Sequence, residues 1–172
     1  MPVSRLVLDK GIVFIGMAGV GKSTIGKLLA RNLNMAFIDL DVYISEKEGK
    51  SPQQIIDETG EDNMLAMEIG YMRNLETKGT VVSPGGSIIY DTPLMDHLKG
   101  SSMLVYLYDT FDNISARIPE VDRRAIIGIK TKSLRQIYDE RSVLYARYAH
   151  ITVDCANKSI ESIVEEIERK LS

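Results

Sequence analysis

The residues with the clearest chemical meaning form the run GMAGVGKS at residues 16–23, which matches the pattern G-x-x-x-x-G-K-[ST] in full. Its glycines let the backbone turn so that successive N–H groups point at phosphate oxygens. In such a loop Lys22 reaches the β- and γ-phosphates, and the Ser23 hydroxyl serves Mg²⁺. A chance turn is the alternative, but an apolar run before the loop and a helical pattern after it favour nucleotide binding. We predict an ATP·Mg²⁺ site at Gly16, Ala18, Gly19, Gly21, Lys22, Ser23 and Thr24.

Two carboxylates, Asp39 and Asp41, stand at the end of a second apolar run, MAFID at residues 35–39. Ligands of open α/β sheets bind outside the carboxyl ends of the strands. A spacing of two at a strand end can aim both carboxylates into one cleft. Asp is also a common N-cap, so the residues alone leave open whether Asp41 acts on a ligand or caps the next helix.

Arg141 lies within an apolar stripe of a predicted helix at residues 133–148. That stripe consists of Leu134, Ile137, Tyr138, Tyr145 and Tyr148. An unpaired buried cation is very costly, so this arginine must have a partner. The partner is either a structural carboxylate, such as Glu68 on another apolar stripe, or a substrate carboxylate, which arginine binds in a bidentate manner.

These residues must be positioned by a fold in which apolar runs alternate with amphipathic segments, which is typical of a parallel sheet covered by helices. We predict a five-stranded, three-layer α/β domain spanning residues 1–172. Its strands are expected at 11–16, 35–39, 80–84, 101–108 and 150–154, and its helices at 23–33, 42–48, 52–59, 62–77, 110–118, 133–148 and 160–171. The helices of about 42–77 are expected to bind substrate, and the irregular segment of about 119–132 to form a lid.

Composition narrows the class of protein further. The net charge of −3 argues against general binding to nucleic acid or membranes. No apolar run approaches the ~20 residues that a membrane helix needs. The one cysteine, Cys155, excludes an intramolecular disulfide and fits a reducing compartment. We therefore expect a cytoplasmic, monomeric enzyme with a small-molecule partner.

Several ordered segments resemble the shikimate kinases, small P-loop enzymes related to nucleoside-monophosphate kinases. The similar segments are IGMAGVGKST, FIDLDVYI, GKSPQQIIDETGE, VVSPGGSII, the arginine-rich lid and YDERSVLYARYAHITVD. Together they extend over nearly the whole chain. This resemblance implies a P-loop kinase fold and ATP-dependent phosphorylation of a small hydroxy acid, most directly the 3-hydroxyl of shikimate.

On the acceptor side, the resemblance implies that Asp41 contacts the substrate hydroxyls and orients the attacking one. It implies that Arg141 binds the substrate carboxylate and that the turn containing Gly85 and Gly86 lies beside the substrate. An ordinary tight turn at Gly85-Gly86 is the alternative. Whether Asp41 accepts a proton or only positions the hydroxyl stays open.

On the donor side, the resemblance implies that Asp39 serves Mg²⁺, through water, and that Arg117 stacks on adenine. Arg124 matches the lid arginine that reaches the phosphates, although the adjacent Arg123 is an alternative. Lys22, Asp41 and Arg124 are the residues expected to act on the reaction itself.

Two departures from the family pattern affect the acceptor side. Leu65 stands where the family has a second arginine for the substrate carboxylate, and Pro84 stands where the pattern has a glycine. A charged hydrogen bond is worth about 1.5–3 kcal/mol, so the loss at Leu65 weakens binding of the expected acceptor by roughly one to two decades. Two alternatives therefore remain: a kinase for another small hydroxy acid or alcohol, and a nucleotide-binding regulator without transfer activity.

Overall fold

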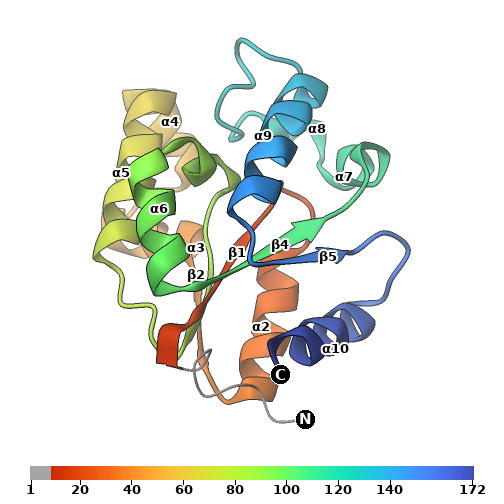
Figure 1. Cartoon of the computed structure of the whole chain (residues 1–172). Helices are drawn as coiled ribbons and strands as arrows, with labels where there is room; N and C mark the ends of the chain where they lie inside the picture. The colour runs from red at the N-terminus through yellow and green to blue at the C-terminus, as the bar shows by residue number, and fades with distance from the viewer. Residues whose placement is uncertain (1–8) are drawn as a thin grey trace.

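The computed structural model describes residues 9–172, so the first eight residues of the expected domain lie outside the described part. At its centre is a five-stranded parallel sheet in the order β2-β3-β1-β4-β5 (Figure 1). The strands are β1 (Ile12–Ile15), β2 (Ala36–Asp39), β3 (Thr80–Ser83), β4 (Met103–Tyr108) and β5 (Ile151–Asp154). The α/β class and the five-stranded parallel sheet predicted from the sequence are confirmed.

Helices cover both faces of the sheet. Helices α2 and α10 pack against one face, and α6 and α9 pack against the other (Figure 1). The helices are α2 (Lys22–Leu33), α3 (Leu40–Glu48), α4 (Pro52–Thr59), α5 (Glu61–Asn74), α6 (Thr92–Ser101), α7 (Phe111–Arg117), α8 (Glu120–Arg123), α9 (Leu134–Tyr148) and α10 (Ile160–Leu171), with a 3-10 helix, η1 (Gly86–Tyr90).

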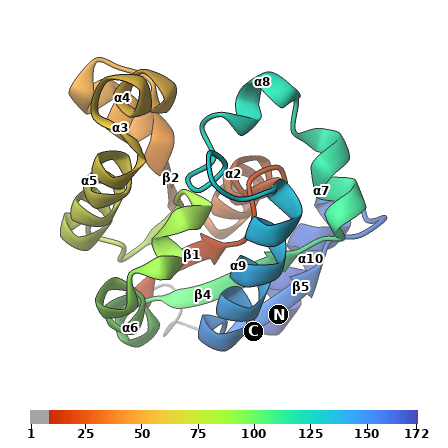
Figure 2. The ribbon, with the colours of Figure 1, turned by 90° about the horizontal axis from the view of Figure 1, so that it is seen from above.

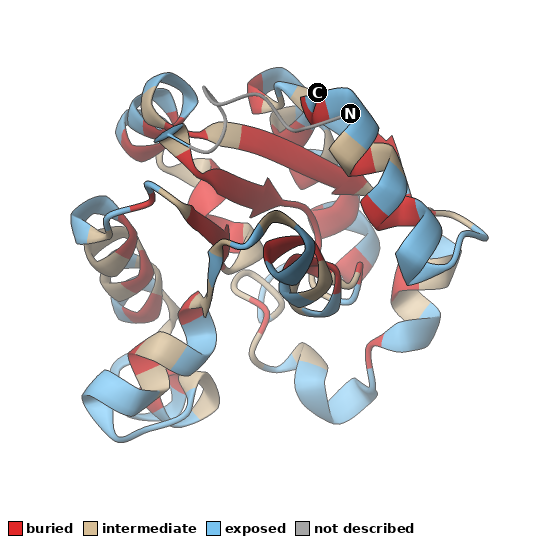
Figure 3. Ribbon diagram, turned by 90° about the horizontal axis from the view of Figure 1, so that it is seen from below, coloured by how far each residue is buried: buried red, intermediate tan, exposed pale blue. Residues whose placement is uncertain are grey.

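The central strands are apolar because both of their faces are covered. Every residue of β1 and of β3 is buried, as Figure 3 shows for the middle of the sheet. Ile12 pairs with Val81 on one side and with Met103 on the other. Parallel strands covered on both faces show continuous apolar runs, which is why these segments could be located from the sequence.

The remaining helices stand at the carboxyl edge of the sheet. Seen from above, α3, α4 and α5 lie to one side of the start of α2, and α7 and α8 lie to the other (Figure 2). The strands β2 and β3 lie on one side of β1, and β4 and β5 lie on the other. The direction in which successive strands are added to the sheet therefore reverses at β1. Open α/β sheets bind ligands at such a switch point, so the fold places a binding region beyond Ile15.

Three expectations about the elements were incomplete or wrong. The interval 87–100 received no assignment, but it contains η1 and α6, which begins after the N-cap Asp91. Helix α5 ends at Asn74 rather than at residue 77. The apolar spacing of residues 160–171 predicts that Ile160 shares the buried stripe of α10, but Ile160 is exposed at the first residue of that helix.

The segment 119–132 is not wholly irregular, since Glu120–Arg123 form the short helix α8. Within residues 9–172, no helix combines the length and the apolar character that crossing a membrane requires.

Candidate active site

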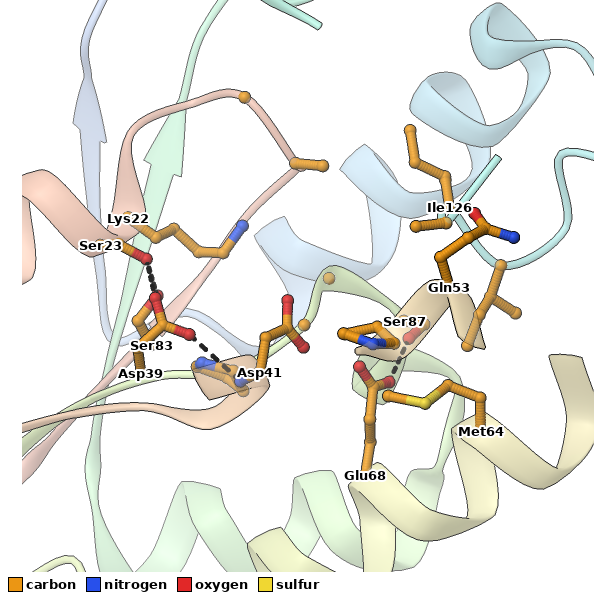
Figure 4. A pocket seen from close by; sticks show the side chains of 18 of the residues that line it. Lys22, Ser23, Asp39, Asp41, Gln53, Met64, Glu68, Ser83, Ser87 and Ile126 are labelled. Carbon is orange, nitrogen blue, oxygen red and sulfur yellow. Dashed lines mark hydrogen bonds between the residues drawn. The ribbon is translucent and has the colours of Figure 1, made fainter. Parts of the chain in front are cut away.

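The carboxyl edge of the sheet carries a pocket of about 530 Å³ that joins the P-loop to the helices on both sides. Figure 4 shows its side chains converging from α2, the β2–α3 junction, α5 and the lid. Most of the sequence-predicted residues line it. These are Ala18, Gly19, Gly21, Lys22, Ser23, Thr24, Asp39, Asp41, Gly85, Gly86, Arg117 and Arg141, whereas Gly16 and Arg124 are not among the lining residues.

The P-loop turns because glycines adopt backbone angles that other residues avoid. Gly19 and Gly21 have φ angles of 80° and 103°, and Gly21 is the N-cap of α2. Lys22, buried beneath the loop, donates hydrogen bonds to the carbonyl oxygens of Gly16 and Met17 at 2.9 and 2.8 Å. Gly16 therefore orients the lysine instead of facing the pocket. Burial lowers the pKa of Lys22 to about 8, although the nearby Asp41 carboxylate opposes that shift.

Ser23 and Asp39 form an oxygen-rich corner beside the P-loop. The Ser23 hydroxyl donates to Oδ2 of Asp39 and lies 3.4 Å from the hydroxyl of Ser83 (Figure 4). Oδ1 of Asp39 accepts the backbone N–H groups of Asp41 and Val42, so Asp39 is the N-cap of α3. Hydroxyl and carboxylate oxygens are the ligands that Mg²⁺ prefers, so this corner fits the expected metal.

Asp41 does not cap α3, since Asp39 performs that role, and the capping alternative for Asp41 is wrong. Its carboxyl points into the pocket between Lys22 and Glu68 (Figure 4). Asp41 is exposed to water in the open pocket, while the neighbouring protein atoms shield part of its carboxyl. This desolvation raises the pKa of Asp41, the charge of Asp39 raises it further, and Lys22 opposes the shift. A raised pKa makes a carboxylate a better acceptor of a proton.

Glu68 lies on the floor of the same pocket and was considered in the sequence only as a structural partner of Arg141. Its Oε2 accepts a hydrogen bond of 2.7 Å from the hydroxyl of Ser87, and its Oε1 lies against Gly85, where a Cβ atom would be only 2.4 Å away. Glu68 makes no ion pair within residues 9–172. Burial, followed by the charge of Asp41, raises the pKa of Glu68 to about 7.

The raised pKa of Glu68 predicts a dependence of stability on pH. In the unfolded chain this carboxyl titrates near 4.5, so the folded protein binds more protons in the interval up to about 7. The resulting stabilisation is complete below 4.5 and is lost as the pH rises through 7. It amounts to an order of 3 kcal/mol, taking about 1.4 kcal/mol for each pKa unit. The variant Glu68→Gln should lose much less stability than the wild type between about pH 5 and pH 8 in urea unfolding; an identical loss in both would contradict the assignment.

Arg141 is 2% exposed and projects from α9 into the pocket. Its Nη2 donates to the carbonyl of Ile127 at 2.7 Å, its Nε donates to the hydroxyl of Tyr90 at 3.3 Å, and its guanidinium lies 5.2 Å from the Tyr90 ring centroid. Within residues 9–172, Arg141 makes no ion pair with Glu68 or with any other carboxylate. The sequence left open that Arg141 pairs with a structural carboxylate such as Glu68. Within the described residues, that alternative is therefore wrong.

The turn at Gly85 and Gly86 needs glycine for close approach, because neither residue has a positive φ. A Cβ on Gly86 would lie 2.7 Å from the hydroxyl of Tyr145 and 3.0 Å from the carbonyl oxygen of Gly16. That Tyr145 hydroxyl donates to the carbonyl of Gly86 at 2.7 Å. The turn is thus clamped between α9 and the P-loop, and its backbone faces the pocket.

The lid arginines occupy three different positions. Arg117 lines the pocket and forms an ion pair with Asp109 at 2.6 Å. Arg123 donates to backbone carbonyls of Ser115 and Ile118, which connects α8 to α7. Arg124 is exposed and lies outside the pocket, and within residues 9–172 it donates only a long hydrogen bond, 3.4 Å, to the carbonyl of Val121. The structure does not bring Arg124 to the other site residues.

Other lining residues were missed by the sequence reasoning. Gln53 lies on the first turn of α4, and Ile126 projects from the lid (Figure 4). Ser87 directly follows the glycine turn, and its polar side chain beside two glycines was an available signal. No motif indicated Gln53 or Ile126, because their approach depends on how the lid lies over α4.

Comparison with known proteins agrees with this geometry. The family model described as shikimate kinase matches residues 18–172. A shikimate kinase of Sulfurihydrogenibium sp. (strain YO3AOP1) is 33% identical over 171 residues, which cover 94% of this chain and 98% of that protein. The chain belongs to the shikimate kinase family. A further shikimate kinase, from Enterococcus faecalis (strain ATCC 700802 / V583), is 32% identical. That match covers 94% of this chain and 98% of the Enterococcus faecalis protein.

Solved shikimate kinases share the fold over nearly the same length. The crystal structure of the Aquifex aeolicus vf5 shikimate kinase matches with a TM-score of 0.82 and 29% identity, over 93% of this chain and 95% of that one. The Acinetobacter baumannii shikimate kinase in complex with shikimate matches with a TM-score of 0.83 and 26% identity, over 94% and 92%. Membership of the shikimate kinase family confirms the predicted enzyme class, an ATP-dependent phosphotransferase with an alcohol acceptor.

Proposed function

We propose that this chain transfers the γ-phosphoryl group of ATP to the 3-hydroxyl of shikimate. The observation that carries the proposal is one pocket in which the P-loop Lys22, the carboxyl of Asp41 and the buried guanidinium of Arg141, which makes no ion pair within residues 9–172, face the same space. A pocket with a phosphate-binding end, a proton acceptor and a cation for a carboxylate suits a small hydroxy acid. The Acinetobacter baumannii relative, solved with shikimate, supports that choice of acceptor.

On the donor side, we assign the backbone N–H groups of residues 16–23 and the Lys22 ammonium to the phosphates of ATP. Lys22 exchanges its hydrogen bonds to the loop carbonyls for the phosphate oxygens, whose negative charge stabilises its protonated form. Ser23 and Asp39 are assigned to Mg²⁺, which when bound neutralises charge on the phosphate oxygens. We assign Arg117 to the base of the nucleotide.

On the acceptor side, we assign Asp41 to the attacking hydroxyl and Arg141 to the substrate carboxylate. The acceptor oxygen forms a bond to the γ-phosphorus as the bond from that phosphorus to the β,γ-bridging oxygen breaks, and the hydroxyl proton passes to the Asp41 carboxylate. Arg141 fixes the far end of the acceptor, so that the hydroxyl points at the phosphorus rather than sampling other orientations. The backbone of Gly85 and Gly86 borders this end of the pocket.

The lid completes the proposed site by moving. Arg124 lies outside the pocket, so its assignment to the transferring phosphoryl group requires the segment 119–132 to close over ATP. Its hydrogen bond to Val121 is long and exposed, and therefore costs little to break.

A second candidate, phosphorylation of a different small hydroxy acid, is favoured by one observation. Leu65 lies on α5 one turn before Glu68, and within residues 9–172 the carboxyl of Glu68 on the floor of the pocket makes no ion pair. Arg141 then binds the acceptor carboxylate alone. An acceptor with an additional hydroxyl or amine near Glu68 would gain from this arrangement.

We expect the variant Leu65→Arg to improve the use of shikimate. An arginine at position 65 lies three residues from Glu68 on the same helical face and adds a second cation for the acceptor carboxylate. The KM for shikimate should fall about tenfold, with little change in the KM for ATP. Leu65→Gln, which is polar but uncharged, is the control, and equal effects of the two variants would contradict this role for charge.

Acceptor-dependent ADP release tests the proposal against the second candidate. Shikimate, its relatives lacking single hydroxyl groups, and other small hydroxy acids should be compared at saturating ATP and Mg²⁺. The proposal expects the highest kcat/KM with shikimate. A higher value with another acid would transfer the assignment to that acid, and a rate no faster than the acceptor-free background with every acid would reject both candidates.

We also infer that the enzyme acts in the cytoplasm. Its one cysteine, Cys155, is a buried free thiol, which suits a reducing compartment, and ATP is the donor that the P-loop is assigned to bind.

A further inference from the structure

Asp109 is a buried acidic residue that the phosphoryl-transfer scheme does not use. It follows the last residue of β4 directly, and its side chain is 0% exposed. Oδ1 accepts hydrogen bonds of 2.7 Å from the backbone N–H of Thr110 and from Nδ2 of Asn113. Oδ2 accepts a hydrogen bond of 2.6 Å from Nη1 of Arg117. Burial of a carboxylate is costly, so this set of donors, which includes a cation, is what makes the position tolerable.

Arg117, the other member of this pair, reaches a region where a nucleotide base can lie. Besides the main pocket, it lines a smaller cavity of about 240 Å³ behind the P-loop. That cavity is bounded by Gly19 and Gly21 on one side and by Cys155 and Lys158, which follow β5, on the other. A base joined through its ribose to phosphates held by the P-loop has this space within reach.

The end of α7 that carries Arg117 is also fixed to the P-loop. A Cβ on Gly19 would lie 2.7 Å from the side chain of Ile118, the residue after Arg117, so the two segments are in direct contact. The hydroxyl of Tyr138 on α9 donates to the backbone carbonyl of Asp109 at 2.8 Å. Asp109 is therefore a rigid anchor, attached to β4, α7 and α9, from which the guanidinium extends.

We propose that Asp109 is a positioning residue that holds the guanidinium of Arg117 in place to stack on the base of the bound nucleotide. This inference rests on the proposed ATP site. An arginine side chain that is 46% exposed would otherwise sample many rotamers, and it would lose that freedom when ATP binds. A planar guanidinium held in advance offers its face to an aromatic base without that loss.

The variant Asp109→Asn removes the charge and keeps most of the local geometry. The asparagine oxygen can still accept from Thr110 and Asn113, while the amide group turned toward Arg117 no longer attracts it. The matched control is Asp112→Asn, which removes the same charge from an exposed position in the first turn of α7. Arg117→Gln removes the exposed member of the ion pair and leaves Asp109, the buried member, unchanged.

Calorimetric titration with ATP and with inorganic tripolyphosphate, both with Mg²⁺, separates the base from the phosphates. Asp109→Asn and Arg117→Gln should each raise the Kd for ATP about three- to tenfold, the range of a lost cation–base contact. Neither should change the Kd for tripolyphosphate. The double variant should bind ATP no more weakly than Arg117→Gln alone, because Asp109 acts through Arg117.

The inference would be overturned by an unchanged Kd for ATP in Asp109→Asn or in Arg117→Gln, by an equal loss of tripolyphosphate affinity, or by additive effects in the double variant. Where Asp109→Asn fails to fold, Arg117→Gln still tests the contact to the base on which the inference depends, and an unchanged Kd for ATP in that variant rejects the inference. Because no acceptor is used, a failure of shikimate phosphorylation leaves this result intact. If the wild type binds tripolyphosphate but shows no added affinity for ATP, the positioning role is rejected while the P-loop assignment stands.

Discussion

The variant Asp41→Asn should lower kcat about 10²–10⁴-fold, the usual contribution of a positioned acid or base. Asparagine has nearly the shape of aspartate but cannot accept the hydroxyl proton. The fold should be unaffected, because Asp39 rather than Asp41 caps α3. ATP affinity should change little, since Lys22 and the P-loop backbone hold the phosphates. Steady-state ADP release with shikimate, together with calorimetric binding of ATP, measures both effects.

The control for Asp41 is Glu46→Gln, which removes a carboxylate from an exposed position on the same helix, α3. Proton acceptance and simple positioning can be separated by the dependence of kcat on pH. The raised pKa of Asp41 predicts that the wild-type rate falls as the pH decreases through that pKa, and that the residual rate of Asp41→Asn lacks this limb. A variant with kcat within a few-fold of the wild type would show that Asp41 is not part of the reaction.

The variant Arg141→Met should raise the KM for shikimate by roughly two decades, because each charged hydrogen bond to the acceptor carboxylate is worth about 1.5–3 kcal/mol. Its effect on stability should be small or favourable. Arg141 is 2% exposed and has no ion-pair partner within residues 9–172, and methionine fills a similar volume. Initial rates at varied shikimate and urea unfolding measure the two quantities on the same preparation.

A structural role for Arg141 would give the opposite pattern. Removing one member of a buried ion pair typically costs about 3–5 kcal/mol of stability, so such a loss with an unchanged KM would contradict acceptor binding. Arg135→Met is the matched control on α9, since Arg135 is exposed and pairs with Asp139. It should change neither the KM nor the free energy of unfolding appreciably.

The elements that the sequence located best are those whose signals are local. Helix α4 runs from Pro52 to Thr59 as predicted, because Ser51 caps it and Pro52 suits its first turn. Helix α6 was missed, although Asp91 caps it and Leu94, Met95 and Leu98 are buried. Helix α6 is short and directly follows the 3-10 helix η1. Its apolar residues therefore continue the apolar run of η1 in the sequence and show no helical periodicity of their own.

The site was less predictable, because contacts between distant segments decide it. Glu68 and Arg141 each lie on an apolar face, which made them natural partners, yet the fold directs Glu68 to Ser87 and Arg141 to Ile127. Asp39 and Asp41 are equivalent in the sequence, and only the start of α3 decides that Asp39 caps the helix. Asp109 was overlooked because an acidic residue after a strand usually belongs to a solvated turn.

The most direct test of the central claim is the identity of the product. Purified protein should be incubated with ATP, Mg²⁺ and shikimate, and the phosphorylated product examined by correlated proton and phosphorus NMR. The proposed function predicts a new phosphate monoester whose phosphorus couples to the proton on carbon 3 of shikimate, formed at a rate that Asp41→Asn largely abolishes. Coupling to another carbon position, or no ester above that in a reaction without the protein, would contradict it.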